Sequence, residues 1–328
     1  MTWASIGCGN VCEVKSLPAM YKLPGSSVAG VYGRQQENAA NFARRHAIPT
    51  VYTSVTQLLA DPNVDIVYVS TPPHTHLQYT MAALDAGKHV YVEKPMGLNY
   101  AECVAMHQHA QLRQKKLFVA HYRRALPYFL QVQSLLQQGA IGRVITAHWQ
   151  LFQPPYPHDG SAQPLPWRLQ ASLAGGGYFF DLAPHGLDIL QFLLDDDIAN
   201  AQGFSTNRGG LYGVEDTVAG SFVTQKGVCG TAHFSFVTTP EAKTDTLTFI
   251  GTSGQITCSV FAFTPIVLSQ SSHTQEFKIE KPQHIQMPLV QTILNDLRGQ
   301  GICPSHSSTA LPTALAMDAM VGSTTQPL

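Results

Sequence analysis

The stretch WASIGCGNVC (residues 3–12) decides how the rest of the chain is interpreted. Its first five residues predict a short apolar strand, and Gly7 and Gly9 then open a glycine-rich turn with the spacing G-x-G-x-x-C. In a dinucleotide-binding turn the first glycine allows a tight bend, and the second lets the backbone approach a pyrophosphate. The amides that follow, beginning with Asn10 and Val11, would face the phosphates from the start of a helix. The motif favours dinucleotide binding over a plain packing turn.

Apolar segments alternate with helical ones along the first part of the chain. Because the strands are apolar on both faces, they predict a parallel sheet that is covered by helices on both sides. Strands are expected at 3–7, 27–33, 64–70, 89–94 and 117–122, and helices at 37–47, 76–88 and 99–116.

The regular alternation of predicted strands and helices ends after residue 122. A helix is expected at 127–142, a long strand at 143–153, a proline-rich loop at 154–166 and an amphipathic helix at 178–194. Short strands separated by turn residues then indicate a mostly antiparallel sheet. These strands are expected at 201–206, 216–225, 228–237, 244–251, 254–260 and 276–280, and closing helices at 288–299 and 309–320.

The predicted fold class is therefore α/β. An N-terminal Rossmann domain with a doubly wound parallel sheet (1–121) precedes a C-terminal α+β domain with an open, mostly antiparallel sheet (122–328). The second domain would bind substrate and mediate oligomerisation, and the expected homo-oligomer is a dimer or a tetramer through the C-terminal sheet.

Composition narrows the classes of partner. Only 12% of the 328 residues are charged and the net charge is −1, so no basic field attracts nucleic acid. The N-terminus lacks the pattern of a signal peptide, and no apolar run has the 18 residues that a membrane span needs. Six scattered cysteines, with no zinc-type or thioredoxin-type pair, predict free thiols and a cytoplasmic location. No nucleic acid, membrane or metal is expected as a partner.

The end of the second strand bears on the choice of cofactor. An acidic residue there would bind the adenosine ribose 2′-hydroxyl of NAD. Here the strand ends in Tyr32-Gly33-Arg34, and the next acid is Glu37 in the following helix. Gly33 has no side chain, and the guanidinium of Arg34 can bind a 2′-phosphate. NADP is therefore preferred, with NAD as the alternative and a solvated Arg34 as the competing interpretation.

Two further strand ends carry polar residues toward the same edge of the sheet. After the strand at 64–70, Ser70, Thr71 and Pro72 would line the cofactor path, because ligands lie beyond the carboxyl ends of parallel strands. The nearby His74 and His76 could suggest a metal, but no Cys or Glu cluster completes such a site. A metal-dependent hydrolase is therefore the weakest alternative.

The next strand ends at Glu93-Lys94-Pro95. Proline restricts Lys94 to extended geometry, so that its amine points out of the strand end. Burial beside a positively charged nicotinamide ring would lower the pKa of this lysine and suit it to proton transfer near neutral pH. Glu93 could orient Lys94 or anchor the cofactor. The competing interpretation is a pair of solvated charges.

The predicted helix at 178–194 offers partners for Lys94. Asp181, His185 and Asp188 share one helical face at i, i+4 and i+7, which suits proton transfer by the histidine. The glycine triplet at 175–177 indicates a close backbone approach. The spacing alone is equally compatible with the solvent face of an amphipathic helix.

The segments IGCGN, STPPHTH, VYVEKPMGLN and GGGYFFDLAPHGLDI together resemble the Gfo/Idh/MocA family of NAD(P)-dependent oxidoreductases, in the family's motif order and over essentially the whole chain. The resemblance implies a Rossmann domain followed by an α/β domain with an open sheet. It also implies oxidation or reduction of a hydroxyl or carbonyl on a sugar, a polyol or a cyclic diol.

The resemblance assigns roles to individual residues. Lys94 matches the catalytic lysine, and its peptide bond to Pro95 is expected to be cis. His185 would be the general acid/base, or share that role with Lys94, and Asp181 would hold the substrate. The expected cofactor-binding residues are Gly7, Gly9, Asn10, Val11, Gly33, Arg34, Ser70, Thr71, Pro72, His76, Glu93, Lys94, Trp167 and Arg168, the last two from a WR motif.

Two positions depart from the family pattern. Cys12 replaces a Gly or Ala in the turn, and Tyr122 stands where relatives have an asparagine beside the substrate pocket. Tyr122, Asp181 and His185 are the expected substrate residues. The alternatives are an NAD-dependent inositol-type dehydrogenase and a non-catalytic NADP-sensing regulatory protein, of which the second would be expected to lose Lys94, Asp181 and His185.

Overall fold

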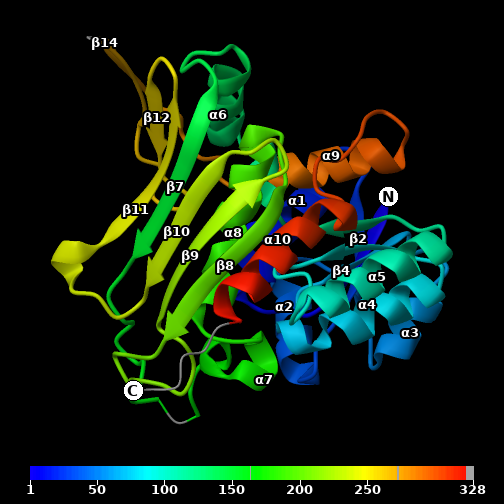
Figure 1. The fold of residues 1–328 in the computed structure, drawn as a ribbon. Coiled ribbons are helices and arrows are strands. Elements are labelled where there is room, and N and C mark those ends of the chain that lie inside the picture. Colours follow the sequence, from blue (N-terminus) through cyan, green and yellow to red (C-terminus); the bar gives the residue numbers. More distant parts are fainter. Residues whose placement is uncertain (163, 272, 323–328) are drawn as a thin grey trace. The chain divides into compact units, whose positions relative to one another are not determined.

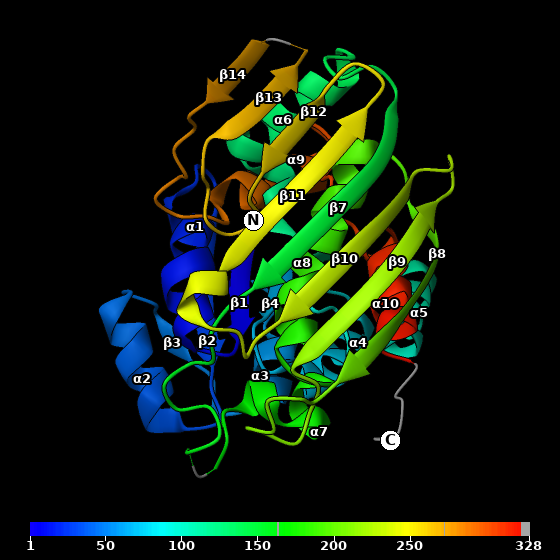
Figure 2. The ribbon, with the colours of Figure 1, turned by 60° about the vertical axis from the view of Figure 1, so that its left-hand side comes forward.

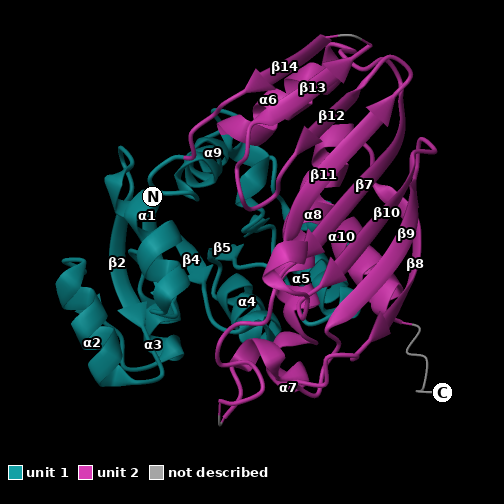
Figure 3. Ribbon diagram, turned by 90° about the vertical axis from the view of Figure 1, so that its left-hand side faces the viewer, with its two compact units in different colours: residues 1–126, 282–311 teal, residues 127–281, 312–328 magenta. Residues whose placement is uncertain are grey.

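The computed structural model describes residues 1–162, 164–271 and 273–322. The chain divides into two compact units, residues 1–126 with 282–311 and residues 127–281 with 312–328, which Figure 3 shows in different colours. The predicted domains, 1–121 and 122–328, differ from these units because residues 282–311 pack with the N-terminal part. The division at residue 121 remains a prediction. Within the described residues, no helix is both long and apolar enough to cross a membrane.

Unit 1 contains a six-stranded parallel sheet with the order β3-β2-β1-β4-β5-β6. The strands β4 and β5 are buried almost throughout, as their apolar sequences IVYV and HVYV predict. The order reverses direction between β1 and β4, so the carboxyl ends of these strands form the usual ligand edge of a doubly wound sheet. The strands are β1 (Thr2–Ile6), β2 (Ser27–Tyr32), β3 (Thr50–Val51), β4 (Ile66–Val69), β5 (His89–Val92) and β6 (Leu117–Val119).

The helices of unit 1 follow the expected alternation (Figure 1). Asn99 caps α5 (Tyr100–Leu112), because its side chain accepts a hydrogen bond from the amide of Glu102. The helix after the glycine turn begins with a π-helical turn, η1 (Cys12–Ser16), which the sequence did not predict. The other helices are α1 (Leu17–Lys22), α2 (Gln36–Arg45), α3 (Val55–Ala60), α4 (His76–Asp85), α5 (Tyr100–Leu112) and α9 (Met287–Leu297), and α10 (Ser307–Val321) contributes residues to both units.

Unit 2 contains an eight-stranded sheet with the order β14-β13-β12-β11-β7-β10-β9-β8, in which only β7 and β10 pair in parallel (Figure 2). The predicted fold class is thereby confirmed. The strands are β7 (Val144–Phe152), β8 (Ile198–Thr206), β9 (Thr217–Thr224), β10 (Cys229–Ser235), β11 (Thr244–Gly251), β12 (Gln255–Cys258), β13 (Ile266–Gln270) and β14 (His273–Phe277).

Two helices of unit 2 pack together, α6 (Pro127–Gln137) and α8 (Tyr178–Leu194), and α8 lies behind the sheet in Figure 2. A Cβ on Gly186 would lie 2.2 Å from the ring of Trp149, so glycine lets α8 sit directly on β7. The Trp149 ring also meets Phe234 edge to face, at 4.8 Å between centroids. This close packing fixes the helix that carries Asp181 and His185.

The last part of the sheet corrects one expectation. The strand expected at 276–280 is β14 at 273–277, and its partner β13 was not predicted. Strand β13 is five residues long and only partly apolar, so its sequence holds too few alternating apolar positions to indicate a strand. The two-residue strand β3 and the helix α3 were also missed, although Ser54 caps α3 by accepting a hydrogen bond from the amide of Gln57.

Candidate active site

The glycine turn has the geometry that a dinucleotide requires. Gly7 has φ +114°, and a Cβ there would lie 2.6 Å from the Ser70 hydroxyl, so only glycine fits. At Gly9, in contrast, no atom lies within 4 Å of the position of a Cβ. A side chain at Gly9 would fill this open space. The residues of the turn therefore fit the pyrophosphate of a nicotinamide dinucleotide.

Cys12 performs the packing role of the third glycine. Its side chain is fully buried, and its Sγ lies 3.5 Å from the Ser5 hydroxyl on β1. Burial raises the pKa of the Cys12 thiol to about 12, so it stays neutral and unreactive. Cysteine is small enough for the helix to approach the strand.

Gly33 is required by packing at the end of β2. A Cβ there would lie 2.6 Å from the Cys8 Sγ and 3.1 Å from the Ala39 Cβ. Arg34 follows and is exposed. Tyr79 on α4 is close enough for Arg34 to influence its pKa, although burial dominates and raises it. The preference for NADP stays a prediction that depends on Arg34.

His76 joins the ends of β4 and β5. Its Nδ1 lies 2.9 Å from the Pro95 carbonyl oxygen, and its Nε2 lies 2.8 Å from the Thr71 carbonyl oxygen. Burial lowers the pKa of His76, while the two carbonyl contacts oppose that shift. The contacts of His76 are thus with the main chain of both loops, and its assignment to the cofactor stays a prediction. Among the described residues, no group of His, Cys, Asp and Glu could hold a metal ion.

Lys94 stands two residues after the end of β5, and the Lys94–Pro95 peptide bond is cis, as the resemblance predicted. Glu93 is only 6% exposed, whereas Lys94 is partly exposed. The Glu93 carboxylate accepts hydrogen bonds from Tyr68 and Gln286 in the core of unit 1. The chain bends at the next residue, and Lys94 keeps part of its surface exposed.

The helix α8 in unit 2 carries the second group of predicted residues. His185 is 5% exposed and Asp188 is 1% exposed, so this face of the helix is not the solvent face. The His185 ring lies 5.5 Å from the Phe261 ring, centroid to centroid, in an edge-to-face contact. Asp181 accepts a hydrogen bond from Arg168 at 2.8 Å. The competing interpretation as a solvated amphipathic face is therefore wrong.

The WR motif and Tyr122 have clear protein contacts. The Arg168 guanidinium lies 4.2 Å from the Trp167 ring centroid and forms an ion pair with Asp181. Tyr122 is buried, and the Arg123 guanidinium lies 5.0 Å from its ring centroid. Their assignment to cofactor and substrate stays a prediction.

Glu215 is a residue of unit 2 that sequence reasoning missed. Its carboxylate accepts a hydrogen bond of 2.6 Å from the Gly177 amide, at the start of α8. A Cβ on Gly177 would lie 2.5 Å from the Glu215 carbonyl oxygen, which accounts for the third glycine of the triplet. Burial raises the pKa of Glu215 to about 6. No signal in the local sequence VED marks this contact with a segment so distant in the chain.

Tyrosines and an aspartate gather beside the same helix start. The Tyr178 hydroxyl donates a 2.7 Å hydrogen bond to Asp159, which also accepts one of 2.9 Å from the Tyr156 amide. The rings of Tyr156 and Tyr178 lie 5.2 Å apart, and Tyr156 is 51% exposed. Asp181 contributes to raising the pKa of Tyr156, after burial. The proline-rich loop thus brings an exposed aromatic ring close to Asp181.

Comparison with known proteins gives the family. Residues 1–121 match the oxidoreductase family with an NAD-binding Rossmann fold, and residues 129–257 match the GFO/IDH/MocA C-terminal domain. A curated relative, oxidoreductase P35 of Formosa agariphila, is 33% identical over 98% of both chains. The 1,5-anhydro-D-fructose reductase of Ensifer adhaerens is 34% identical over 72% of this chain and 69% of its own.

A solved structure shows the same fold over nearly the whole length. The aldose-aldose oxidoreductase from Caulobacter crescentus, complexed with glycerol, superposes with a TM-score of 0.86 and 20% identity, and covers 98% of this chain and 96% of its own. Together with the full-length match to a curated oxidoreductase, this fold and the glycine turn lead to one conclusion. The chain belongs to the Gfo/Idh/MocA family of NAD(P)-dependent oxidoreductases.

Proposed function

We propose that the protein transfers a hydride between NADP and a hydroxyl or carbonyl carbon of a sugar, a polyol or a cyclic diol. The observation that carries the proposal is the contrast just after β5, where Glu93 is buried and the next residue, Lys94, is partly exposed. A lysine held next to a buried, hydrogen-bonded residue is suited to proton transfer.

The cofactor accepts or supplies the hydride when it is bound. Gly7 and Gly9, with the amides of Asn10 and Val11, bind its pyrophosphate, and Arg34 binds the 2′-phosphate that distinguishes NADP from NAD. The residues Ser70, Thr71, Pro72 and Trp167 line its path.

The substrate is handled by protonatable groups. Lys94 and His185 serve the same hydride transfer, in which one takes the hydroxyl proton during oxidation or returns it to the carbonyl oxygen during reduction. Asp181, oriented by its ion pair with Arg168, accepts a hydrogen bond from a neighbouring hydroxyl of the substrate. The name of the Ensifer relative, an anhydrofructose reductase, supports a sugar-like substrate.

A cofactor-coupled screen tests the proposal. Purified protein is incubated with sugars, polyols and diols and with the oxidised cofactor, and in the reverse direction with the corresponding carbonyl compounds and the reduced cofactor, using NADP and then NAD. The change in absorbance of the reduced nicotinamide reports turnover. We expect activity on at least one sugar or polyol, with NADP preferred. No turnover with any of these hydroxyl or carbonyl compounds, with either cofactor, would contradict the proposal.

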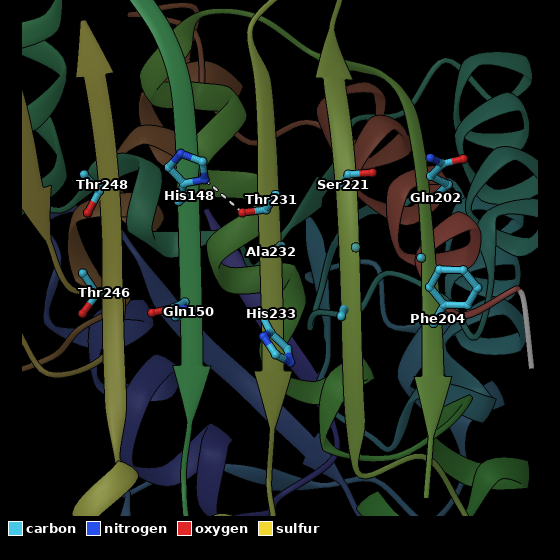
Figure 4. A pocket seen from close by; sticks show the side chains of 13 residues that line it. His148, Gln150, Gln202, Phe204, Ser221, Thr231, Ala232, His233, Thr246 and Thr248 are labelled. Carbon is cyan, nitrogen blue, oxygen red and sulfur yellow. Dashed lines mark hydrogen bonds between the residues drawn. The ribbon is translucent and has the colours of Figure 1, made fainter.

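We also propose a homo-oligomer, a dimer or a tetramer, that forms through the open face of the unit-2 sheet. Figure 4 shows polar side chains, among them His148 and Thr231, on neighbouring strands of this sheet. They line a cavity of about 570 Å³, and His148 Nδ1 lies 2.9 Å from the Thr231 hydroxyl. Phe204 at its margin is 62% exposed. Light scattering of the wild type and of Phe204→Asp should show a larger assembly only for the wild type. A monomeric wild type would refute this proposal.

A cytoplasmic location is proposed on the state of the cysteines. None of the six cysteines, all of which lie in the described part of the chain, forms a disulfide, and four of them are buried. Free thiols are typical of a reducing compartment.

A further inference from the structure

A series of buried hydrogen bonds crosses the core of unit 1 and ends on the carboxylate next to Lys94. The Ser16 hydroxyl donates to the Tyr68 hydroxyl at 2.7 Å, and the Tyr68 hydroxyl donates to Glu93 Oε1 at 2.6 Å. The side-chain amide of Gln286 donates to the same Glu93 oxygen at 2.8 Å. Ser16, Tyr68 and Gln286 have no exposed surface. We call Ser16, Tyr68 and Glu93 the buried relay.

The direction of the bonds is fixed by the number of protons. A hydroxyl has one proton, and Tyr68 gives its own to Glu93, so the 2.7 Å contact requires Ser16 to donate to Tyr68. On the other side, the Tyr91 hydroxyl donates to Gln286 at 2.7 Å, and Gln286 donates to Glu93. Both series therefore end on Glu93, whose carboxylate accepts without donating. Aligned donors of this kind polarise one another and strengthen the final bonds.

Burial, followed by the charge of Glu93, raises the pKa of Tyr68 well above its ordinary value. Tyr68 therefore remains a protonated donor. The Tyr68 and Tyr91 rings stack at 5.2 Å between centroids, on the neighbouring strands β4 and β5. The relay is thus built into the packed centre of the parallel sheet.

The first member of the relay belongs to the helix that follows the glycine turn. Ser16 closes the π-helical turn η1, and its hydroxyl also lies 3.4 Å from the carbonyl oxygens of Val11 and Cys12. The shorter contact to Tyr68 decides where its proton goes. Single π-helical turns are rare and are found often at functional sites. The relay therefore begins on the helix that follows the glycine turn, whose amides are proposed to bind the cofactor phosphates, and it ends one residue before Lys94.

We propose that Glu93 is a positioning residue that couples the phosphate-binding turn to Lys94 through Tyr68 and Ser16. This inference rests on the proposed function for the role of Lys94, whereas its effect on cofactor binding does not. Glu93 is held from two sides and points into the core, so the backbone of the next residue cannot rotate freely. Loss of the relay therefore weakens the positioning of Ser16 after the glycine turn and of Lys94 at the same time.

The two stacked tyrosines provide a matched test. Tyr68→Phe removes a buried hydroxyl within the relay. Tyr91→Phe removes the buried hydroxyl that donates to Gln286, outside the relay. Both variants keep the aromatic ring. Cofactor binding is measured without substrate by titration of the protein fluorescence, and kcat, KM and the thermal midpoint are measured in parallel. Tyr68→Phe should weaken cofactor binding and lower kcat by about tenfold each, the size expected for a lost hydrogen bond to a charged group. Tyr91→Phe should change cofactor affinity and kcat by less than about twofold each, although it should lower the thermal midpoint about as much as Tyr68→Phe does.

Two further variants keep the test decisive if Tyr68→Phe folds poorly. Ser16→Ala breaks the same relay at its outer end, and in Ser16→Ala/Tyr68→Phe the losses should not multiply, because both changes break one connection. Glu93→Gln retains an oxygen acceptor and should be less impaired than Glu93→Ala. Equal losses of binding and turnover in Tyr68→Phe and Tyr91→Phe would overturn the inference and leave the relay a structural feature. Normal turnover in Lys94→Met would instead refute the proposed catalytic role of Lys94, without affecting the binding result.

Discussion

The polar groups of unit 1 and those of unit 2 are organised differently. Around Lys94, Glu93 and His76 are buried, and their polar atoms are engaged by fixed protein partners. In unit 2, the Arg168–Asp181 ion pair is partly exposed, and Tyr156 on the proline-rich loop is half exposed. The difference suits a fixed part that handles the common cofactor and an adaptable part that handles a particular substrate. Changes in unit 1 should thus affect every substrate, and changes in the unit-2 loop should alter substrate preference.

The largest effect is expected from the fixed part. Lys94→Met should lower kcat by about a hundredfold or more for every substrate, because it removes a proton-transfer group and keeps a similar shape. Steady-state kinetics measures this loss, with the exposed Lys243→Ala as the control. If turnover stays near that of the wild type, Lys94 has no catalytic role.

His185 should give a smaller loss with a characteristic pH dependence. His185→Asn should lower kcat by about tenfold to a hundredfold, because it removes a group that acts in the proton-transfer step, and it should flatten the pH–rate profile. The exposed His273→Asn on β14 is the control. A profile with the same shape in wild type and His185→Asn would exclude His185 as the titrating group.

The cofactor preference should depend on one exposed cation. Arg34→Asp should shift the ratio of kcat/KM for NADP over that for NAD by about tenfold toward NAD, because a charge-assisted contact to the 2′-phosphate is lost. Arg44→Asp, the same charge change near the other end of α2, should leave the ratio unchanged. An unaltered ratio in Arg34→Asp would show that this arginine does not select the cofactor.

The smallest effect is on stability and concerns Glu215. Its pKa is raised by burial from 4.5 to about 6, so the folded state holds its proton more tightly than the unfolded state. The resulting stabilisation is present below pH 4.5 and is lost as pH rises through about 6, with a size of about 2 kcal/mol. Glu215→Gln should remove this pH dependence from urea unfolding measured across that range. The exposed Glu241→Gln should retain it, and equal slopes in wild type and Glu215→Gln would contradict the assignment.

Local patterns in the sequence predicted the parts of the molecule that depend on local physics. The glycine turn follows from steric and hydrogen-bonding rules, and α8 occupies the predicted residues 178–194 because its apolar periodicity is long. The end of β5 could be recognised because proline restricts the residue before it.

Distant contacts could not be predicted in this way. Gln286 reaches Glu93 across 193 positions of the chain, and Glu215 reaches Gly177 across 38. Neither contact leaves a periodicity or a turn signal in the sequence, since it depends on tertiary packing alone. The hydrogen bonds that hold Glu93 therefore depend on residues that no local pattern connects to it.

The central claim is that Lys94 and His185 serve the same hydride transfer. A double-mutant cycle with Lys94→Met, His185→Asn and the combined variant tests it most directly, with kcat measured at saturating cofactor and substrate. Because both residues act on one proton-transfer step, we predict that the combined variant is only slightly slower than Lys94→Met. Losses that multiply fully in the combined variant would contradict the claim.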